Sequence, residues 1–414
     1  MKQKIFSGYE IFVIAILTIL QFTLILDFMV MSPLGPFLMP KLHITPAQFG
    51  MVVSAYAFSA GLSGILAAGF ADRFDRKKLL LFFYIGFIGG TLFCGLATSY
   101  SMLLLARTIT GIFGGVIGSI IFAIITDIFK LEVRGRVMGF VQMAFASSQV
   151  LGLPIGLYFA NLWGWHSPFI MIVLVSLVVL GVVIIFLKPI NEHLKIKTQR
   201  NAFVHLGKTA SNTFYLKTFA ATTLLATGGF MMMPFGTVFG VNNLKISPDS
   251  LPMLYTVTGI FSMILGPLIG RASDGWGKYR MFFAGSVLMM VIVIIYCNLG
   301  PTPLWMVVAL NVIMFAGISA RMISSQALLS AIPEPSDRGA FMSINASVQQ
   351  ISGGIAAYVA GLIVVQTTPT SELLHYDILG YVVAVSIMIT IGMMWFVNRR
   401  VMRKLAPVSI PVNP

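Results

Sequence analysis

Long, continuous apolar runs separated by short polar segments follow one another along nearly the whole sequence. The hydrocarbon core of a bilayer is about 30 Å thick, so a spanning helix needs roughly 20 mostly apolar residues. The runs are continuous rather than alternating, which favours helices over a β-barrel, because every backbone group in lipid must be paired within the protein. The pattern predicts an all-α, polytopic membrane protein with twelve spans, near residues 11–38, 47–70, 79–97, 101–127, 137–161, 167–187, 217–241, 251–270, 280–298, 303–329, 340–365 and 376–397.

Composition supports the same class of protein. The chain has 414 residues, of which 57% are hydrophobic and 10% are charged, far from the composition of a soluble globular domain. The first apolar run begins at Ile11 and is too long for a cleavable signal peptide, and no small-residue cleavage site follows it. We therefore expect an integral protein of the plasma membrane, the inner membrane in a bacterium, whose first helix stays attached.

The distribution of positive charge predicts the orientation of the chain. The net charge is +14, which on its own would suggest a nucleic-acid partner. All but four of the 27 Lys and Arg residues, however, fall on one side of the predicted spans; the exceptions are Lys41 and Lys245 on the other side, and Arg107 and Arg321 within spans. Since Lys and Arg in short loops mark the cytoplasmic side, both termini are expected in the cytoplasm. The charge then reflects topology and contact with the lipid leaflet, and no nucleic-acid partner is expected.

Two segments about half a chain apart share a pattern. Leu26–Pro46 contains Pro-x-Gly and ends in Ile-Thr-Pro, and Gly229–Pro248 contains Pro-x-Gly and ends in Ile-Ser-Pro. Two pairs of charged loop residues repeat at nearly the same offset, Asp72 with Asp274 and Arg134 with Arg338. Such a repeat implies two similar six-helix halves related by an axis along the membrane normal, with the substrate path at their interface.

The longest polar segment separates these two halves. We expect an N-terminal six-helix half over residues 1–187, a cytoplasmic linker over 188–216, a C-terminal six-helix half over 217–400 and a cytoplasmic tail over 401–414. The apolar residues of the linker, around Phe203, allow a short surface helix. A solvated tether without structure is the alternative.

The loop after the second span carries a motif. It reads AGFADRFDRK from Ala68 to Lys77, and it resembles Gly-x-Leu-Ala-Asp-Arg-x-Gly-Arg-Lys, the first cytoplasmic loop of the major facilitator superfamily. The residues that match include Asp72, Arg73, Arg76 and Lys77, whereas Ala68 and Asp75 replace the two glycines. The resemblance covers nearly the whole chain and is to the twelve-span drug:proton antiporter and sugar-efflux branch. It implies a transporter without naming the substrate.

Charged residues of the cytoplasmic loops are predicted to control access from that side. Such a loop needs a tight turn, an Asp that caps a helix N-terminus and bases that hold the cytoplasmic face. The predicted gating residues are Asp72, Arg73, Arg76, Asp127, Arg134, Asp274 and Arg338. The alternative is that the basic residues only set the topology.

Asp27 is the one carboxylate that falls well inside an apolar run. In the fourth span, Arg107 and Gly111 match the Arg and Gly of the family's fourth-helix motif, although Thr110 replaces the usual Gln. Asp27 lies about 24 Å from the inner start of its helix and Arg107 about 9 Å from the outer start of its own, so both reach the outer half of the membrane. We expect the two side chains to be close. We predict that Asp27 takes and releases the coupling proton, because desolvation favours the neutral acid and Arg107 the charged one; a static structural pair is the alternative.

Arg321 in the tenth span is the second charge within the membrane. At the usual helical rise it lies about 27 Å from the outer start of its span, which is nearer the cytoplasm. Two interpretations stay open. Arg321 either attracts an anionic or hydroxyl-rich substrate, or it pairs with a loop acid such as Asp72 or Asp127.

Polar residues on two further helices are candidates for the lining of a substrate cavity. They are Gln142 and Gln149, seven residues apart in the fifth span, and Asn345 and Gln349, four apart in the eleventh. Together with Asp27 and Arg321 they form the predicted substrate-binding set. Hydrogen bonding between helices is the alternative role for the four amides.

The sequence as a whole predicts a secondary active transporter, in particular one for proton-coupled efflux of a small organic molecule, drug-like or sugar-like, by alternating access. The alternatives are a uniporter or symporter of an organic anion that uses Arg321 and, from another class, a channel or receptor. The sequence has no paired carboxylates, no nucleophile with a base and no metal-ligand spacing, so no enzyme activity, metal or cofactor is expected. The expected partners are a small-molecule substrate, protons and the lipid bilayer, and the protein is expected to be a monomer.

Overall fold

The structure is helical throughout the part of the chain that it describes. The computed structural model describes residues 6–70, 73–195, 202–334, 337–368 and 370–405. Within these ranges the backbone forms helices and loops, together with one isolated bridge between Val365 and Leu374. The expected all-α fold class is confirmed.

The N-terminal half contains helices α1 to α8. They are α1 (Gly8–Val30), α2 (Gly35–Leu42), α3 (Pro46–Phe70), α4 (Arg76–Gly95), α5 (Tyr100–Ile128), α6 (Leu131–Ser147), α7 (Leu153–Trp163) and α8 (Ser167–Phe186), with a π-helical turn, η2 (Ser148–Gly152), between α6 and α7. A 3-10 turn, η3 (Glu192–Lys195), and a short helix, α9 (Ala202–Ala210), follow in the segment that joins the halves. Of the two expectations for this segment, the structure therefore has the short helix.

The C-terminal half contains helices α10 to α16. They are α10 (Thr213–Phe230), α11 (Gly236–Asn242), α12 (Leu251–Trp276), α13 (Lys278–Cys297), α14 (Leu304–Ser330), α15 (Arg338–Ile363) and α16 (Tyr376–Leu405), with a 3-10 turn, η4 (Pro248–Ser250), before α12. Among the described residues, eleven helical segments are long and apolar enough to cross a membrane. The seventh predicted span is not one of them; it is divided between α10 and α11. The count of twelve stays a prediction.

Proline accompanies the breaks in three of the predicted spans. Pro33 lies in the turn between α1 and α2, and Pro234 lies in the corresponding turn between α10 and α11. A proline inside a helix lacks the N–H donor, and its ring clashes with the carbonyl four residues earlier. Pro154 follows the π-turn η2, which includes Val150, the residue four positions before the proline. The breaks in α1/α2 and α10/α11 fall at equivalent places in the two halves.

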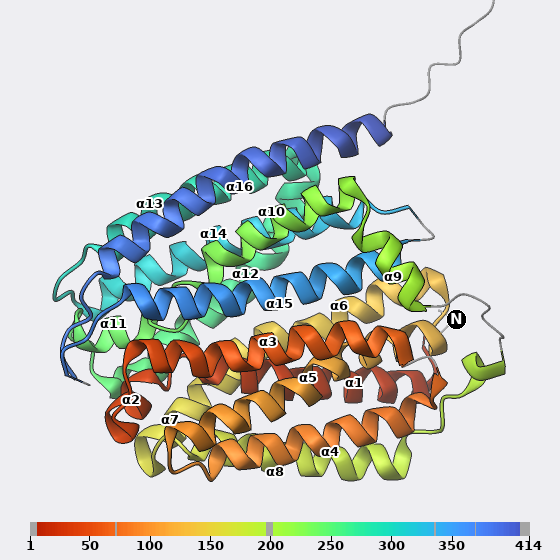
Figure 1. Cartoon of the computed structure of the whole chain (residues 1–414), viewed down its shortest axis with the longest axis horizontal. Helices are drawn as coiled ribbons and strands as arrows, with labels where there is room; N and C mark the ends of the chain where they lie inside the picture. The colour runs from red at the N-terminus through yellow and green to blue at the C-terminus, as the bar shows by residue number, and fades with distance from the viewer. Residues whose placement is uncertain (1–5, 71–72, 196–201, 335–336, 369, 406–414) are drawn as a thin grey trace, which may run out of the picture.

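The helices form two bundles that lie side by side. In Figure 1 the N-terminal half occupies the lower part and the C-terminal half the upper part, and α3 runs alongside α15 where the halves meet. A second contact between the halves is made by α12, which packs against α7 and η2. The helices α3 and α15 approach closely because glycines face the partner backbone. A Cβ on Gly50 would lie 2.8 Å from the carbonyl oxygen of Ala357, and one on Gly361 would lie 2.8 Å from that of Pro46.

The two ends of the molecule differ in how the halves pack together. We call the end at which α1 begins and α16 ends the basic end, and the end that holds α2 and α11 the distal end (Figure 1). At the distal end one hydrophobic core contains residues of both halves, among them Leu34 and Val238. Toward the basic end, one core is built from residues of the N-terminal half and a separate core from residues of α9 and the C-terminal half. The hydrophobic core that both halves share therefore lies at the distal end.

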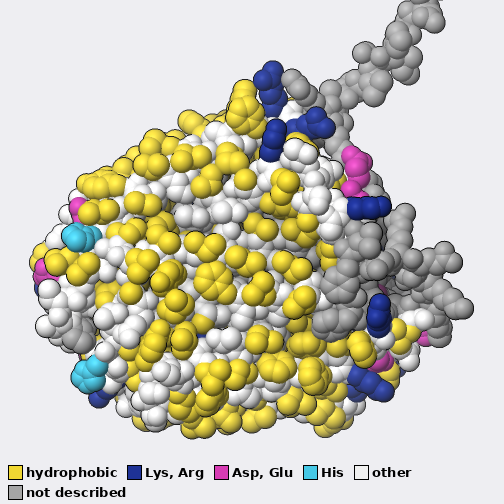
Figure 2. All heavy atoms as spheres, viewed as in Figure 1, with side chains coloured by type: hydrophobic (Ala, Val, Ile, Leu, Met, Phe, Trp, Pro, Cys, Tyr) yellow, Lys and Arg dark blue, Asp and Glu magenta, His cyan; other side chains and the backbone are white. Residues whose placement is uncertain are grey.

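The surface is that of a membrane-embedded protein. Figure 2 shows hydrophobic side chains over the middle of the molecule and Lys and Arg side chains gathered at the basic end. Large apolar side chains such as Phe82, Ile185 and Trp305 are exposed on α4, α8 and α14, and soluble monomers rarely carry an apolar surface of this extent. The chain is an integral membrane protein, and its Lys and Arg distribution predicts that the basic end faces the cytoplasm.

Candidate functional site

Asp27 and Arg107 form an ion pair in the interior of the N-terminal half. Arg107 Nη1 donates a hydrogen bond of 2.8 Å to Asp27 Oδ2 and another of 3.2 Å to the backbone oxygen of Asp27. Both side chains are completely buried. The structure therefore brings together the two residues that the sequence placed at the same depth, and their role in proton coupling stays a prediction.

Two further side chains complete this site. Thr91 Oγ1 donates a hydrogen bond of 3.1 Å to Asp27 Oδ1, so that each carboxylate oxygen has a donor. The guanidinium of Arg107 lies over the ring of Tyr56, with Cζ 4.5 Å from the ring centroid, an attractive cation–π geometry. Neither Thr91 nor Tyr56 was predicted from the sequence. Their depth along α4 and α3 agrees with that of the pair, but depth alone does not distinguish them from other residues at the same level.

The electrostatics of the pair follow from its burial. Moving two charges out of water is costly, and the cost is offset here by their attraction and by the additional hydrogen bonds. Removal of one partner leaves an uncompensated charge, which destabilises a protein by about 3–5 kcal/mol. Protonation of Asp27 removes its negative charge and with it the attraction for Arg107. The site can therefore exist in two electrostatic states that differ in how strongly α1 is held to α5.

Arg321 lies buried in the C-terminal half without an acidic partner among the residues described. Its Nη1 contacts Met289 Sδ at 2.9 Å, and its Cζ lies 5.9 Å from the centroid of the Phe282 ring. Its Nε and Nη2 have no hydrogen-bond partner within the described part of the chain. Of the two loop acids considered as partners, Asp127 instead accepts a hydrogen bond from an arginine of α4, and Asp72 lies outside the described residues.

The charge of Arg321 lies closer to the membrane centre than its position in the sequence indicates. The Cα lies nine residues before the basic end of α14. A Cβ on Gly228, however, would be 3.6 Å from Arg321 Nη2, and Gly228 is only two residues before the break that ends α10. Side chains of a helix tilt toward its N-terminus, and α14 begins at the distal end. The guanidinium is therefore displaced from its Cα toward the distal end.

The four amides predicted to line the cavity lie in different environments. Gln142 is exposed on α6, whereas Gln149 is buried within the π-turn η2. Asn345 is buried, and its Oδ1 accepts a hydrogen bond of 2.6 Å from Thr222 Oγ1 of α10. Gln349, one turn further along α15, is half-buried. Asn345 thus bonds between helices, which was the alternative role, and contact of the four amides with a substrate stays a prediction.

Three contacts of the predicted gating residues each lie within one half. Arg76 Nε donates a hydrogen bond of 2.9 Å to Asp127 Oδ2 and joins α4 to α5. Arg134 donates hydrogen bonds to two backbone carbonyls near the end of α5. Asp274 forms an ion pair with Lys278, across the junction of α12 and α13. These contacts stabilise the basic end of each half. None of the three joins one half to the other.

Of the remaining predicted gating residues, the structure describes only some side chains. Arg73 is exposed, Asp72 lies outside the described residues, and so does the side chain of Arg338. Asp75, which departs from the family motif, has a structural role. Its Oδ1 accepts a hydrogen bond of 3.0 Å from a backbone N–H in the first turn of α4, and its Oδ2 accepts one of 3.1 Å from the backbone N–H of Ile190. The carboxylate therefore ties this loop to the segment after α8.

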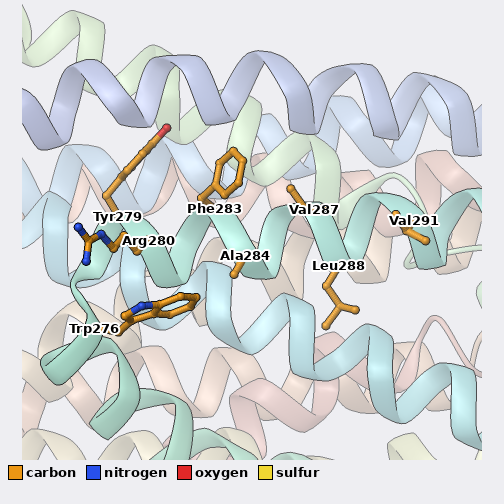
Figure 3. A pocket seen from close by; sticks show the side chains of 8 residues that line it. All are labelled: Trp276, Tyr279, Arg280, Phe283, Ala284, Val287, Leu288 and Val291. Carbon is orange, nitrogen blue, oxygen red and sulfur yellow. The ribbon is translucent and has the colours of Figure 1, made fainter.

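An open apolar groove of about 810 Å³ lies on the outer surface of α13 (Figure 3). Its lining residues are Trp276, Tyr279, Arg280, Phe283, Ala284, Val287, Leu288 and Val291. None of the predicted site residues lines this groove. It lies on a lipid-facing surface of the bundle and is separate from the buried charges.

No metal site or disulfide is found in the described part of the chain. No group of three or more His, Cys, Asp or Glu residues there could hold a metal ion. Cys94 and Cys297 are both buried and unpaired. Cys94 Sγ lies 3.8 Å from Thr110 Oγ1, beside the ion pair.

Comparison with known sequences assigns both halves to the same protein family. The profile of the Major Facilitator Superfamily matches residues 17–245 and 218–411. An uncharacterized MFS-type transporter of Bacillus subtilis (strain 168), YceJ, is 32% identical over 269 residues, which cover 64% of this chain and 67% of that protein. Multidrug resistance protein 2 of the same organism is 25% identical over 301 residues, which cover 70% of this chain and 74% of that protein.

A solved structure shares the fold. A bacterial homolog of the human lysosomal transporter Spinster, in an inward-facing and unoccupied conformation, superposes with a TM-score of 0.75 over 96% of this chain and 98% of that chain. At 17% sequence identity the match concerns the fold alone. The family profile extends over both helical halves, and the charges buried between the helices are typical of a transport pathway. The chain belongs to the Major Facilitator Superfamily and is a membrane transporter.

Proposed function

We propose that this transporter is a proton-coupled antiporter that exports a small organic molecule, with Asp27 as the proton-binding residue. The observation that carries the proposal is the completely buried carboxylate of Asp27, held by the cation of Arg107 and the neutral donor Thr91. Ionisable residues within a membrane are costly and mark ion and substrate pathways. Export is supported by the similarity to Multidrug resistance protein 2 of Bacillus subtilis.

In the proposed cycle, Asp27 exchanges the ion pair for a proton. A proton that arrives from outside neutralises the carboxylate and weakens the contact between α1 and α5. When the proton leaves toward the cytoplasm, the contact with Arg107 forms again. A proton shifts a conformational equilibrium only by its different affinity for the two conformations. The distance between Asp27 and Arg107 provides that difference, because the cation disfavours protonation only while it is near.

A chain of contacts links the ion pair to the other half of the molecule. The ring of Tyr56, beneath Arg107, lies 5.5 Å from the ring of Phe28, measured between centroids. Phe28 directly follows Asp27, and its ring lies 5.9 Å from that of Phe230 in α10. A movement of α1 on protonation therefore acts directly on a contact between the halves.

The packing between the halves supports alternating access. At the distal end the halves share a hydrophobic core, and Ser32 Oγ donates a hydrogen bond to the carbonyl of Met233. At the basic end the cores are separate. We infer that the distal end is closed in this conformation and that transport requires these distal contacts to open in a second conformation.

Transport by the variant Asp27→Asn tests the proposal. Inverted membrane vesicles that contain the wild-type protein are expected to accumulate at least one compound from a panel of labelled small organic molecules when a pH gradient is imposed. Asn has nearly the size of Asp, but its amide binds no proton at the pH values on either side of the membrane. The variant is therefore expected to lose gradient-driven accumulation. It is expected to keep counterflow, the exchange of labelled for unlabelled substrate. The charge-matched control is Asp249→Asn, at an exposed acid in η4.

Two results would count against the proposal. Gradient-driven accumulation by Asp27→Asn at the wild-type level would exclude Asp27 as the coupling residue. Wild-type flux that is not accelerated by unlabelled substrate on the opposite side would indicate a channel instead of a carrier.

A further inference from the structure

In each half, an arginine of the fourth predicted span lies beside the first predicted span. The two halves differ in the residue that contacts this arginine. In the N-terminal half, Arg107 of α5 pairs with Asp27 of α1. In the C-terminal half, the guanidinium of Arg321 from α14 lies beside Gly228 of α10. Gly228 is followed by Gly229, which corresponds to Asp27 in the internal repeat. The C-terminal half therefore also has an arginine beside its first span, although Arg321 corresponds to a position near Ile117 and not to Arg107 in the repeat, and it lacks the acid.

The helices around Arg321 provide no substitute for the missing acid. The sequences of α10, α13, α14 and α15 contain neither Asp nor Glu. The helix α12, which also packs against α14, contains Asp274, but that carboxylate is exposed and forms an ion pair with Lys278. The sequence of α16 contains only Asp377, in its first turn at the distal end. No ion pair of Arg321 is formed with any residue that the structure describes. A buried cation without a partner is strongly unfavourable, so Arg321 is a candidate for binding an anion from outside the described residues.

The unused donors of Arg321 lie on one edge of the guanidinium. Nη1 is occupied by the sulfur of Met289, whereas Nε and Nη2 are buried and unpartnered. The N–H groups of Nε and Nη2 point in parallel, and this edge binds a planar carboxylate through two hydrogen bonds. The hydroxyl of Ser286 is also buried and unpartnered. Ser286 lies on the same face of α13 as Phe282 and Met289, both of which contact Arg321, and offers a further donor.

We propose that Arg321 binds a carboxylate of the transported molecule, so that the substrates of this chain are organic monoanions with an apolar body. The side chains of Phe282 and Met289 provide the apolar surroundings, together with Ile387, which lies against Gly228. One guanidinium balances one carboxylate, whereas a dianion would bring a second, uncompensated charge into the interior. The inference rests on the proposed function, since it names the substrate class of the exporter, but its test requires no proton gradient.

Binding to the purified full-length protein in detergent, at fixed pH, tests the assignment. The probes are a panel of aryl and alkyl carboxylic acids, each paired with its primary amide, and binding is measured as a concentration-dependent rise in the temperature of unfolding. At least one acid is expected to bind, with its amide weaker by about tenfold or more. Arg321→Gln is expected to weaken binding of that acid by about tenfold or more. Arg321→Lys keeps the charge without the parallel donors and is expected to give an intermediate affinity.

A second variant keeps Arg321 and supplies the missing acid. A Cβ on residue 228 would lie in ordinary contact with Arg321 Nη2, at 3.6 Å, so the carboxylate of Gly228→Asp reaches the free edge of the guanidinium. This variant is expected to unfold at a higher temperature than Gly228→Asn and to lose binding of the acid. Gly228→Asn is the control for size, because it adds the same volume without the charge, and it is expected to bind the acid more tightly than Gly228→Asp.

Three results would overturn the assignment: binding of no acid in the panel, binding of amides as tightly as acids, or equal binding of the acid by Gly228→Asp and Gly228→Asn. The proposed proton coupling fails by a different measurement. If Asp27→Asn accumulated substrate normally under a gradient, Asp27 would lose its role, and the binding results at Arg321 would still decide whether the substrate is an anion.

Discussion

Asp27 is held by donors from two helices, one charged and one neutral. Arg107 of α5 binds Oδ2, and Thr91 of α4 binds Oδ1. The bond from Thr91 fixes the plane of the carboxylate, so that Oδ2 is directed at the guanidinium. At the scale of the single residue, Thr91 is therefore a positioning residue for the ion pair.

Thr91→Val removes this donor with little change of side-chain volume. A hydrogen bond to a charged group contributes about 1.5–3 kcal/mol, so the variant is expected to lose that amount of stability, measured by unfolding in detergent. Thr91→Ser keeps the hydroxyl and is expected to lose less. The matched comparison is Thr237→Val, which removes a neutral bond with Tyr255 and is expected to cost about 0.5–1.5 kcal/mol. A loss at Thr91 no greater than that at Thr237 would contradict an ionised Asp27.

Counting residues along helices predicts the ion pair but not its full surroundings. A helix rises by a fixed distance per residue, so the depths of Asp27 and Arg107 follow from the sequence alone. The same count locates only the Cα of Arg321, because it does not include the direction of a long side chain toward the helix N-terminus. Thr91 could not be recognised, since a threonine in an apolar helix is ordinary until the packing of α4 places it beside a carboxylate.

At the scale of the helices, glycines set the distance between α3 and α5. Arg107, Gly111 and Gly115 are spaced four residues apart, so they lie on one face of α5. A Cβ on Gly111 would be 2.5 Å from the carbonyl oxygen of Tyr56, and one on Gly115 would be 2.3 Å from that of Ala60. Such close approach is typical of small residues four apart in membrane helices. The same approach brings the Tyr56 ring against the guanidinium of Arg107.

Gly115→Ala is therefore expected to push α3 and α5 apart. Because the obstacle is backbone and has no other rotamer, we expect a loss of stability of about 1–3 kcal/mol, measured as a lower unfolding temperature in detergent. Gly118 lies in the same helix with nothing within 4 Å of its Cβ position. Gly118→Ala is the control and is expected to leave stability unchanged or to raise it. If both variants lost a similar amount of stability, the close approach of α3 to α5 would not be the reason for the loss at position 115.

Apolar runs predict where the helices lie but not where they break. Hydropathy averages over a window, and the turns at Pro33 and Pro234 are as apolar as the helices around them. The Pro-x-Gly pairs were visible as a repeat between the halves, and proline with glycine is also the ordinary signal of a turn. Pro154 also stands in a Pro-x-Gly pair, Pro154-Ile155-Gly156, so the same signal is present there. The signal does not specify the form of the break, because a proline allows a kink, a break or a wider turn, and here the chain forms a π-turn that packs against α12.

At the scale of the whole molecule, the contacts between the halves are unequal at the two ends. The shared core at the distal end joins α2 to α11, while the described ion pairs of the gating residues at the basic end stay within one half. The repeat in the sequence predicts the two halves but cannot predict which end is closed. Each half has similar elements at both ends, and the choice depends on small differences in packing energy between two conformations.

A disulfide across the distal end tests whether those contacts must open. A Cβ on Gly35 would lie 2.7 Å from Cγ2 of Val238, so cysteines at these positions have Cβ atoms near the separation of about 3.5–4.5 Å that a disulfide requires. Oxidation of the variant Gly35→Cys/Val238→Cys is expected to stop substrate counterflow in proteoliposomes, and reduction is expected to restore it. Each single cysteine variant is the control, and the native Cys94 and Cys297 are buried and should not react. Counterflow at the wild-type rate in fully cross-linked protein would mean that the α2/α11 contact stays closed throughout transport, and the distal opening would then have to lie elsewhere between the halves.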